Sequence, residues 1–191
     1  MSSSRISGSS PSRGTSPVRR SRRWPRQGAE VRVEIRKVRP VEQLRSHLTI
    51  QAPRWLVWEA LADLEAVSEW NPGVDAVECV SSRRHGLGAR RRCFMHPSGW
   101  VVESVSEWEP VDSIGFTVEN AAPLRSGLGR FVLCEEGSGT RLRAGFDYEV
   151  RFGPLGPVID RLIVHRQLSS AWSSAMAGLR DHVEVRAAAF D

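Results

Sequence analysis

The chain of 191 residues is 40% apolar and 26% charged, long enough for one globular domain with a tail and too short for two full-sized domains. No apolar run approaches the roughly 20 residues that cross a bilayer, so we expect no transmembrane segment. The three scattered cysteines argue against a disulfide framework or a zinc site, and they favour a reducing, cytoplasmic location.

The net charge of +5 is concentrated in the N-terminal segment. Residues 1–28 hold seven arginines and no acidic residue, and subtracting these from the 27 basic residues leaves 20 against 22 acidic ones, a net charge of −2. Because this segment has almost nothing to bury, we expect residues 1–40 to form a disordered Ser/Arg-rich tail. Its arginines could contact polyanions through charge alone, and no motif predicts a specific nucleic-acid partner.

Residues 41–186 carry the pattern of a folded domain, followed by a short C-terminal tail over 187–191. The pattern predicts a strand over 44–51, a helix over 54–63 that starts after a proline, and a further helical turn over 64–70. From there the apolar period changes to two. It predicts six strands, joined by short connections into an antiparallel meander, near 74–81, 88–96, 100–108, 113–119, 128–136 and 140–151.

Gly153 to Pro157 should end the last strand, and an apolar stripe with steps of three and four then predicts a long helix. The stripe runs through Val158, Leu162, His165, Ser169, Trp172, Met176, Leu179 and Val183. We therefore predict an α+β fold, in which a curved seven-stranded antiparallel sheet packs against the long C-terminal helix over a ligand pocket, with two short helices after the first strand.

Strand parity predicts which side chains face this pocket. In strand 100–108 we assign the face with Glu103 and Glu107 to water, because unpaired buried carboxylates are costly. The opposite face then carries Trp100, Ser104, Ser106 and Trp108 inward. If the hairpin closes at Pro97–Gly99 with Trp100 opposite either Pro97 or Met95, Arg91 lies on that interior face. A three-residue loop would reverse this parity.

The hairpin between the last two strands gives a second set of interior residues. A two-residue loop at Ser138-Gly139 would pair Leu133 with Ala144 and Phe131 with Phe146. The predicted apolar lining is then formed by Phe116, Phe131, Leu133, Phe146 and Tyr148.

Several inward residues could act on a ligand. Arg91 would need an acid, water, the cavity rim or a ligand oxygen, and its guanidinium suits a carboxylate, a phosphate or a β-dicarbonyl. His165 could move protons and Tyr148 could donate a hydrogen bond, although both residues, like Ser169, also suit structural roles. We expect the aromatic ligand surface from Trp100, Trp108 and Trp172, with Met176 on the same stripe as Trp172.

Signals for other chemistry are absent from the sequence. It has no phosphate-binding loop, no GxSxG and no HExxH, and its five histidines lack metal-ligand spacing. We therefore expect no cofactor and no metal. An enzyme built on this chain would act through acid–base and positioning effects in its pocket.

Short motifs are spread over residues 43–186. They are Ile50-Gln51-Ala52-Pro53-Arg54-Trp55-Leu56-Val57-Trp58, Leu61-Ala62-Asp63, Glu69-Trp70-Asn71-Pro72, Gly86-Leu87-Gly88-Ala89-Arg90, Trp108-Glu109-Pro110, Gly139-Thr140-Arg141-Leu142 and Gly153-Pro154-Leu155-Gly156. Through them the chain resembles the START-like, Bet v 1-like (SRPBCC) superfamily, specifically its polyketide cyclase/dehydrase group.

The resemblance implies a helix-grip fold around a hydrophobic cavity that binds a lipid, sterol, quinone or polyketide. Some members cyclise, aromatise or dehydrate a poly-β-keto chain delivered by an acyl carrier protein, and hold its oxygens with inward arginine and hydroxyl groups. Arg91, Ser104 and Ser106 could serve that way here.

Three hypotheses follow. In the first, the protein is a cyclase- or dehydratase-like enzyme in which Arg91 stabilises enolate oxygens and His165 or Tyr148 moves a proton. In the second, it binds or transports an apolar metabolite without catalysis. In the third, it is an interaction module with a collapsed pocket.

Overall fold

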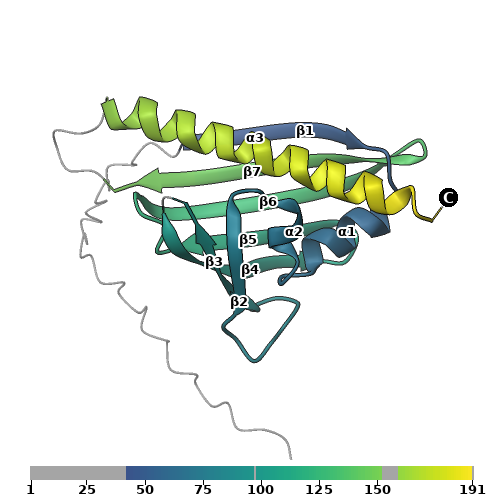
Figure 1. Ribbon diagram of the computed structural model, residues 1–191, viewed down its shortest axis with the longest axis horizontal. Coiled ribbons are helices and arrows are strands. Elements are labelled where there is room, and N and C mark those ends of the chain that lie inside the picture. The colour runs from purple at the N-terminus through teal and green to yellow at the C-terminus, as the bar shows by residue number, and fades with distance from the viewer. Residues whose placement is uncertain (1–41, 97, 152–158, 191) are drawn as a thin grey trace, which may run out of the picture. The chain divides into compact units, whose positions relative to one another are not determined.

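The computed structural model describes residues 42–96, 98–151 and 159–190. Within these ranges the chain forms seven strands and three helices (Figure 1). In chain order they are β1 (Glu42–Ile50), α1 (Arg54–Ala62), α2 (Val67–Trp70), β2 (Val74–Cys79), β3 (Arg90–Met95), β4 (Gly99–Glu109), β5 (Ser113–Glu119), β6 (Leu124–Glu136), β7 (Gly139–Val150) and α3 (Ile159–Ala187). The predicted tail over 1–40, the break over 153–157 and Val158 lie outside the described residues.

The seven strands form one antiparallel sheet in the order β1-β7-β6-β5-β4-β3-β2. Strands β2 to β7 follow one another as a meander, which confirms the prediction, and β1 pairs with β7 at the far edge. No helix in the described ranges has both the length and the apolar character needed to cross a membrane.

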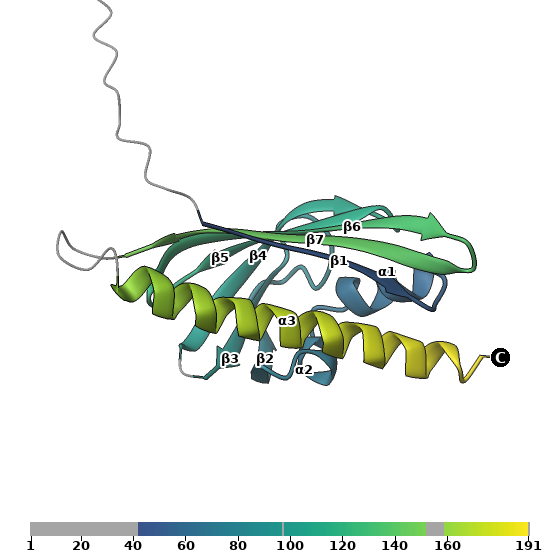
Figure 2. The same ribbon diagram turned by 90° about the horizontal axis from the view of Figure 1, so that it is seen from above.

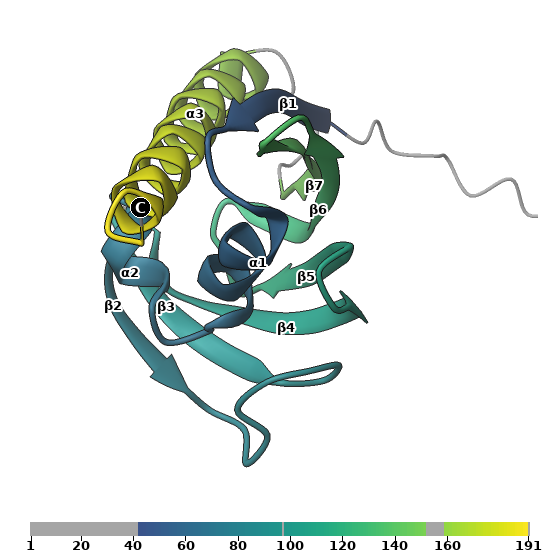
Figure 3. The same ribbon diagram turned by 90° about the vertical axis from the view of Figure 1, so that its right-hand side faces the viewer.

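All three helices lie on the concave side of the sheet. Seen end-on, the sheet curves from β2 round to β1, with α1 inside the curve and α3 across the gap between the two edge strands (Figure 3). Helix α3 runs beside β1 for much of its length (Figure 2) and also contacts α1 and α2. The core therefore forms between the concave face and these helices.

Helix α1 begins after Pro53, whose extended backbone conformation (φ −64°, ψ 148°) suits the residue before a first helical turn. It buries Val57, Trp58 and Leu61 against the core, as the sequence predicts. The side chain of Asp63 then accepts hydrogen bonds from the backbone N–H groups of Glu65 and Ala66, which fixes the bend between α1 and α2. This bend, residues 63–66, is called the elbow below.

The predicted pairing of β3 with β4 is wrong by one residue. Met95 pairs with Gly99 and Arg91 with Glu103, so three residues form the loop, and this is the arrangement that reverses the parity. Gly99, the first residue of β4, has a positive φ of 73°, a conformation that glycine adopts readily. Glu103 therefore shares the interior face with Arg91.

A β-bulge in β4 turns Trp108 to the interior face, as predicted. The register shifts between Val105 and Glu107, and beyond it Trp108 pairs with Ile114 and packs against the core. Trp100, Ser104 and Ser106 lie before or within this irregularity. On the outer face the Trp100 ring contacts the guanidinium of Arg92, and Ser104 pairs with Arg90. Our prediction that these three residues face the interior is wrong.

The β6–β7 hairpin differs from the prediction by two residues, which preserves the face. Leu133 pairs with Leu142 and Phe131 with Ala144, because the loop is Gly137-Ser138, where Gly137 supplies the positive φ of 62°. A shift of two leaves every side chain on the same side of the sheet. The predicted lining residues Phe116, Phe131, Leu133 and Tyr148 are accordingly buried, and Phe146 is half-buried on the same face.

Helix α3 approaches α2 closely at Gly178. A Cβ atom built at this glycine would lie 2.1 Å from the carbonyl oxygen of Trp70 and 3.2 Å from Pro72 Cδ. Both neighbours belong to the short segment that ends α2, so the contact holds α3 against the helical end of the domain. Gly178 does not have a positive φ. Glycine is required here because a side chain would clash with the Trp70 carbonyl.

We expect Gly178→Ala to destabilise the protein by about 1–3 kcal/mol, because α3 must move away from the Trp70 carbonyl. Without this contact, alanine would stabilise the helix relative to glycine by about 1 kcal/mol. Urea unfolding measures the change, with the exposed Ser174→Ala on the same helix as the control. An unchanged or higher free energy of unfolding for Gly178→Ala would contradict the close approach.

Candidate functional site

Two of the predicted proton-transfer residues meet in the interior. The hydroxyl of Tyr148 on β7 and Nδ1 of His165 on α3 lie 2.9 Å apart in a hydrogen bond. Tyr148 is 1% exposed and His165 is half-buried. When the proton of the neutral imidazole is on Nε2, the phenol donates to Nδ1, and the two groups can exchange a proton.

A row of aromatic side chains extends from this pair across the concave face. The Tyr148 ring stacks on Phe146 (centroids 5.7 Å apart), Phe146 on Trp172 (5.9 Å), and Trp172 on Phe131 (5.8 Å), with interplanar angles of 20° to 24°. The Phe131 ring meets that of Phe116 edge-on at 6.3 Å. Trp172 from α3 therefore lies over the two neighbouring strands β6 and β7.

Gly127 and Ser46 hold this row in place. The Phe146 ring covers Gly127 of β6, where an added Cβ would come within 2.6 Å of the ring, so a larger residue would displace it. The indole Nε1 of Trp172 donates a hydrogen bond to Ser46 Oγ of β1 at 2.9 Å. Trp172 and Met95 pack against both groups of buried core residues, one around α1 and one around Tyr148.

Arg91 faces the interior, as predicted, but an acid on the neighbouring strand neutralises it. Its Nε donates to Glu103 Oε2 at 2.7 Å and its Nη1 to the Leu64 carbonyl at 3.1 Å. The side chain of Arg91 is 5% exposed and that of Glu103 is 19% exposed. The guanidinium carbon lies 5.0 Å from the centre of the Phe116 ring. Nη2 has no hydrogen-bond partner among the described residues.

The aromatic row thus has a polar pair at each end. Arg91 and Glu103 lie at the Phe116 end, and Tyr148 and His165 at the other. The row separates the two pairs, so the structure does not bring Arg91 together with His165. A ligand in this interior would meet apolar rings along its length and hydrogen-bonding groups near its ends.

The buried thiol of Cys93 lies beside the ion pair. Its Sγ is 3.9 Å from Glu103 Oε2, and burial, followed by the negative charge of Glu103, raises its pKa to about 12. The thiol therefore stays protonated near neutral pH and is a poor nucleophile. Within the described residues, no three His, Cys, Asp or Glu side chains are grouped as a metal would require.

The remaining predicted site residues are dispersed. Trp100 is 40% exposed on the outer face, where its ring packs against Phe94 and the guanidinium of Arg92. Ser104 accepts a hydrogen bond from Arg90 Nε on that face, and Ser106 is exposed. Met176 is buried on α3, and Ser169 is half-buried one helical turn after His165.

Sequence reasoning missed two interior residues, Glu103 and Ser46. A direct signal for Glu103 was available, since the three-residue loop places a glutamate opposite an inward arginine, whereas the chosen parity left that arginine unpaired. Ser46 interrupts the apolar alternation of Leu44, Leu48 and Ile50 in β1, and that interruption marks a hydrogen-bonding position on an inward face.

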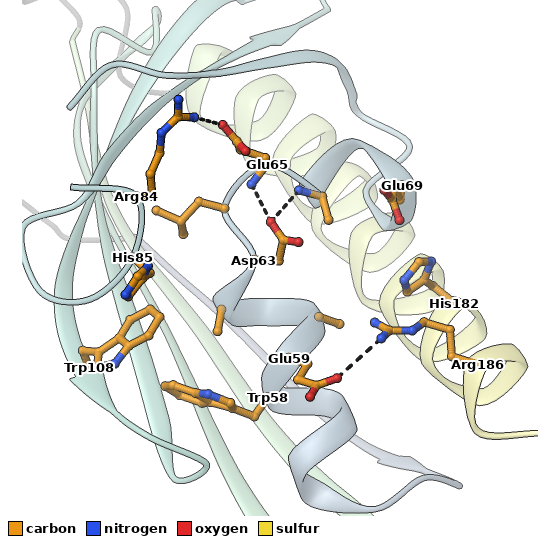
Figure 4. A pocket seen from close by; sticks show the side chains of 14 residues that line it. Trp58, Glu59, Asp63, Glu65, Glu69, Arg84, His85, Trp108, His182 and Arg186 are labelled. Atoms are coloured by element: carbon orange, nitrogen blue, oxygen red, sulfur yellow. Dashed lines mark hydrogen bonds and ion pairs between the residues drawn. The ribbon is translucent and has the colours of Figure 1, made fainter. Parts of the chain in front are cut away.

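A groove of about 630 Å3 lies over the elbow between α1 and α2 (Figure 4). Trp58 and Trp108 line one end, with ring centres 5.0 Å apart, and Arg84 and His85 come from the connection between β2 and β3. His182 and Arg186 of α3 line the opposite side. Carboxylates of α1, the elbow and α2 lie between them: Glu59, Asp63, Glu65 and Glu69.

Comparison with known proteins assigns the family. The family described as polyketide cyclase / dehydrase and lipid transport matches residues 41–184, and the chain belongs to it. No curated protein matches the sequence. The fold is that of the START-like and Bet v 1-like helix-grip proteins, and it forms a framework for binding hydrophobic ligands.

Solved structures with the same fold include proteins of several kinds. Protein TTHA0849 from Thermus thermophilus is 24% identical with a TM-score of 0.65, over 76% of this chain and 99% of that one. The Zhui aromatase/cyclase from Streptomyces sp. R1128 is 19% identical with a TM-score of 0.66, over 77% and 96%. A START superfamily protein from Mycobacterium smegmatis is 16% identical with a TM-score of 0.57, over 78% and 99%.

We expect Glu103→Gln to destabilise the protein by about 3 kcal/mol, because it leaves the buried Arg91 charge without its counter-charge. The matched control is Glu78→Gln, which removes the partner of Arg92 in an exposed ion pair and should cost about 1 kcal/mol or less. Chemical denaturation measures both. Equal losses for the two variants would show that the Arg91–Glu103 pair is as solvated as a surface pair.

We expect Cys93 to resist alkylation in the folded protein. With a pKa of about 12, only about one thiol in ten thousand is ionised at pH 8, and burial also excludes the reagent. Iodoacetamide labelling followed by peptide mass spectrometry measures the rate, and protein unfolded in guanidinium is the control. Labelling of Cys93 at the same rate in both states would contradict its placement.

Proposed function

We propose that the protein binds a hydrophobic, carbonyl-bearing small molecule between the concave sheet and α3, and that Tyr148 and His165 move a proton on it. The observation that carries the proposal is the hydrogen bond between these residues at one end of an aromatic row. A phenol and an imidazole in contact within an apolar interior can form an acid–base pair, because each can donate and accept a proton.

The reaction class we propose is cyclisation or dehydration of a poly-β-keto compound. His165 accepts, directly or through Tyr148, a proton from a carbon between two carbonyls, and the resulting enolate carbon attacks a ketone carbon of the same chain. The new alkoxide takes up a proton, and loss of water then removes that hydroxyl with a neighbouring hydrogen. The sequence is redox-neutral and calls on proton transfer and positioning alone.

In this proposal Arg91 has a smaller role than the stabilisation of enolate oxygens that the sequence analysis assigned to it. Glu103 and the Leu64 carbonyl hold two edges of its guanidinium, and Nη2 is left to bind a ligand oxygen at the Phe116 end. Trp172, Phe131 and Phe146 would pack on the faces of the bound molecule. Delivery of the substrate by an acyl carrier protein, which the sequence resemblance implies, belongs to the same proposal.

A second candidate function is binding or transport of an apolar metabolite without turnover. The family description includes lipid transport, and the contacts of Arg91 give it a structural role that needs no substrate. The two functions share the interior site and differ in whether the Tyr148–His165 pair acts on the ligand. Proton exchange on a simple ketone separates them.

We expect the protein to accelerate deuterium exchange at the carbons beside the carbonyl of 2-tetralone, an apolar ketone with a fused aromatic ring. Tyr148→Phe and His165→Gln should each lower the acceleration about 100-fold or more while 2-tetralone still binds. NMR follows the exchange, and tryptophan fluorescence follows binding. His47→Gln, which changes an exposed histidine on β1, is the matched control.

The outcomes separate the candidates. Binding without acceleration by the unmodified protein would favour the transport function. Acceleration that survives both substitutions would contradict the assignment of Tyr148 and His165.

A further inference from the structure

The groove over the elbow is separate from the aromatic row, and the proposed reaction leaves it unused. Its volume of about 630 Å3 falls within the roughly 300–1,000 Å3 of small-molecule sites. It is lined by charged and aromatic side chains from six parts of the chain: α1, the elbow, α2, the β2–β3 connection, β4 and α3. The charged side chains of this lining determine whether the groove suits an anion or a cation.

Both arginines of the groove are already paired with carboxylates. Arg84 Nη1 forms an ion pair with Glu65, and Arg186 Nη2 lies 3.5 Å from Glu59 Oε2 (Figure 4). An anionic ligand would have to displace one of these carboxylates before it could bind a guanidinium. The groove therefore does not favour anions, despite its two arginines.

Two further carboxylates have no basic partner among the described residues. Asp63 uses Oδ1 to accept the two elbow N–H groups, which leaves Oδ2 open, and Glu69 of α2 is exposed in the groove. The lining carries four carboxylates and two guanidinium groups. A cation is attracted by this excess, and a neutral imidazole can accept a hydrogen bond from an ammonium group.

The end of the groove opposite α3 is aromatic. Trp58 on α1 and Trp108 on β4 meet edge-to-face at 72°, and Trp108 is half-buried, so part of it is open to the groove. A tryptophan ring attracts cations to its face and packs against planar apolar groups. The β-bulge of β4 is what turns Trp108 toward this side of the sheet.

We propose that this groove is a second binding site, which takes a small organic ammonium ion that also carries an aromatic or apolar group. The ammonium lies by Asp63 and Glu69, and the apolar part packs on the Trp58–Trp108 pair. The site is distinct from the interior proposed for the carbonyl-bearing ligand, although Leu64 adjoins both, since it lines the groove and its carbonyl accepts the hydrogen bond from Arg91.

The test uses tryptamine hydrochloride as the cationic probe and indole-3-propionate as an anion of similar size. We expect tryptamine to bind with a Kd of about 1 mM, to shift the indole N–H resonances of Trp58 and Trp108 in NMR spectra, and to bind more weakly at 0.5 M salt. We expect indole-3-propionate to leave these two resonances unchanged. Trp58→Phe and Trp108→Phe assign the two signals and preserve most of the packing.

Two carboxylate variants test the charge requirement. Glu69→Gln should weaken tryptamine binding about threefold, whereas Glu149→Gln on β7, outside the groove, should leave it unchanged. Tyr148→Phe should also leave it unchanged, because the interior is a separate site.

Several results would overturn the proposal. One is equal binding of the anion and the cation at Trp58 and Trp108. Another is a tryptamine-induced shift confined to the indole of Trp172 in the interior. A third is a lack of any response from the groove up to 10-fold above the expected Kd of about 1 mM.

Discussion

The packing of one long helix against the concave face of a curved sheet determines the rest of this structure. Trp172 carries much of this contact, because its ring stacks on side chains of two neighbouring strands while its indole nitrogen bonds to a third. An antiparallel sheet this curved cannot bury its inner face against itself, so α3 must supply the second layer. Less than two turns further along α3, Gly178 allows the helix to touch the end of α2 and the segment after it.

The polar groups enclosed by this packing are few and mostly paired, as low-dielectric surroundings require. Arg91 has a carboxylate and a backbone carbonyl, and Tyr148 has a histidine. The two pairs differ in kind: one is a full ion pair that is costly to break, and the other is a hydrogen bond between two groups that can each donate and accept a proton. This contrast is why we assign anchoring to the first and proton transfer to the second.

Much of the fold could be predicted from the sequence, because strand periodicity, the proline before α1 and the long helical stripe are local signals. The facing of side chains in β4 is harder to predict, because the length of one loop and a bulge each change the parity by a single residue. The charge match of Arg91 with Glu103 is the sequence signal that favours the correct loop. The contact of Tyr148 with His165 was also beyond local reasoning. The two residues are only 17 positions apart, but they lie on different elements, and their meeting depends on how α3 crosses the sheet.

Leu64 occupies a position with consequences for communication within the domain. Its main-chain oxygen steadies the guanidinium on the inside, while the same residue forms part of the outer groove, next to an aspartate that holds the bend. A change in the backbone of this bend would therefore move the Leu64 carbonyl and alter one of the two hydrogen bonds that hold Arg91.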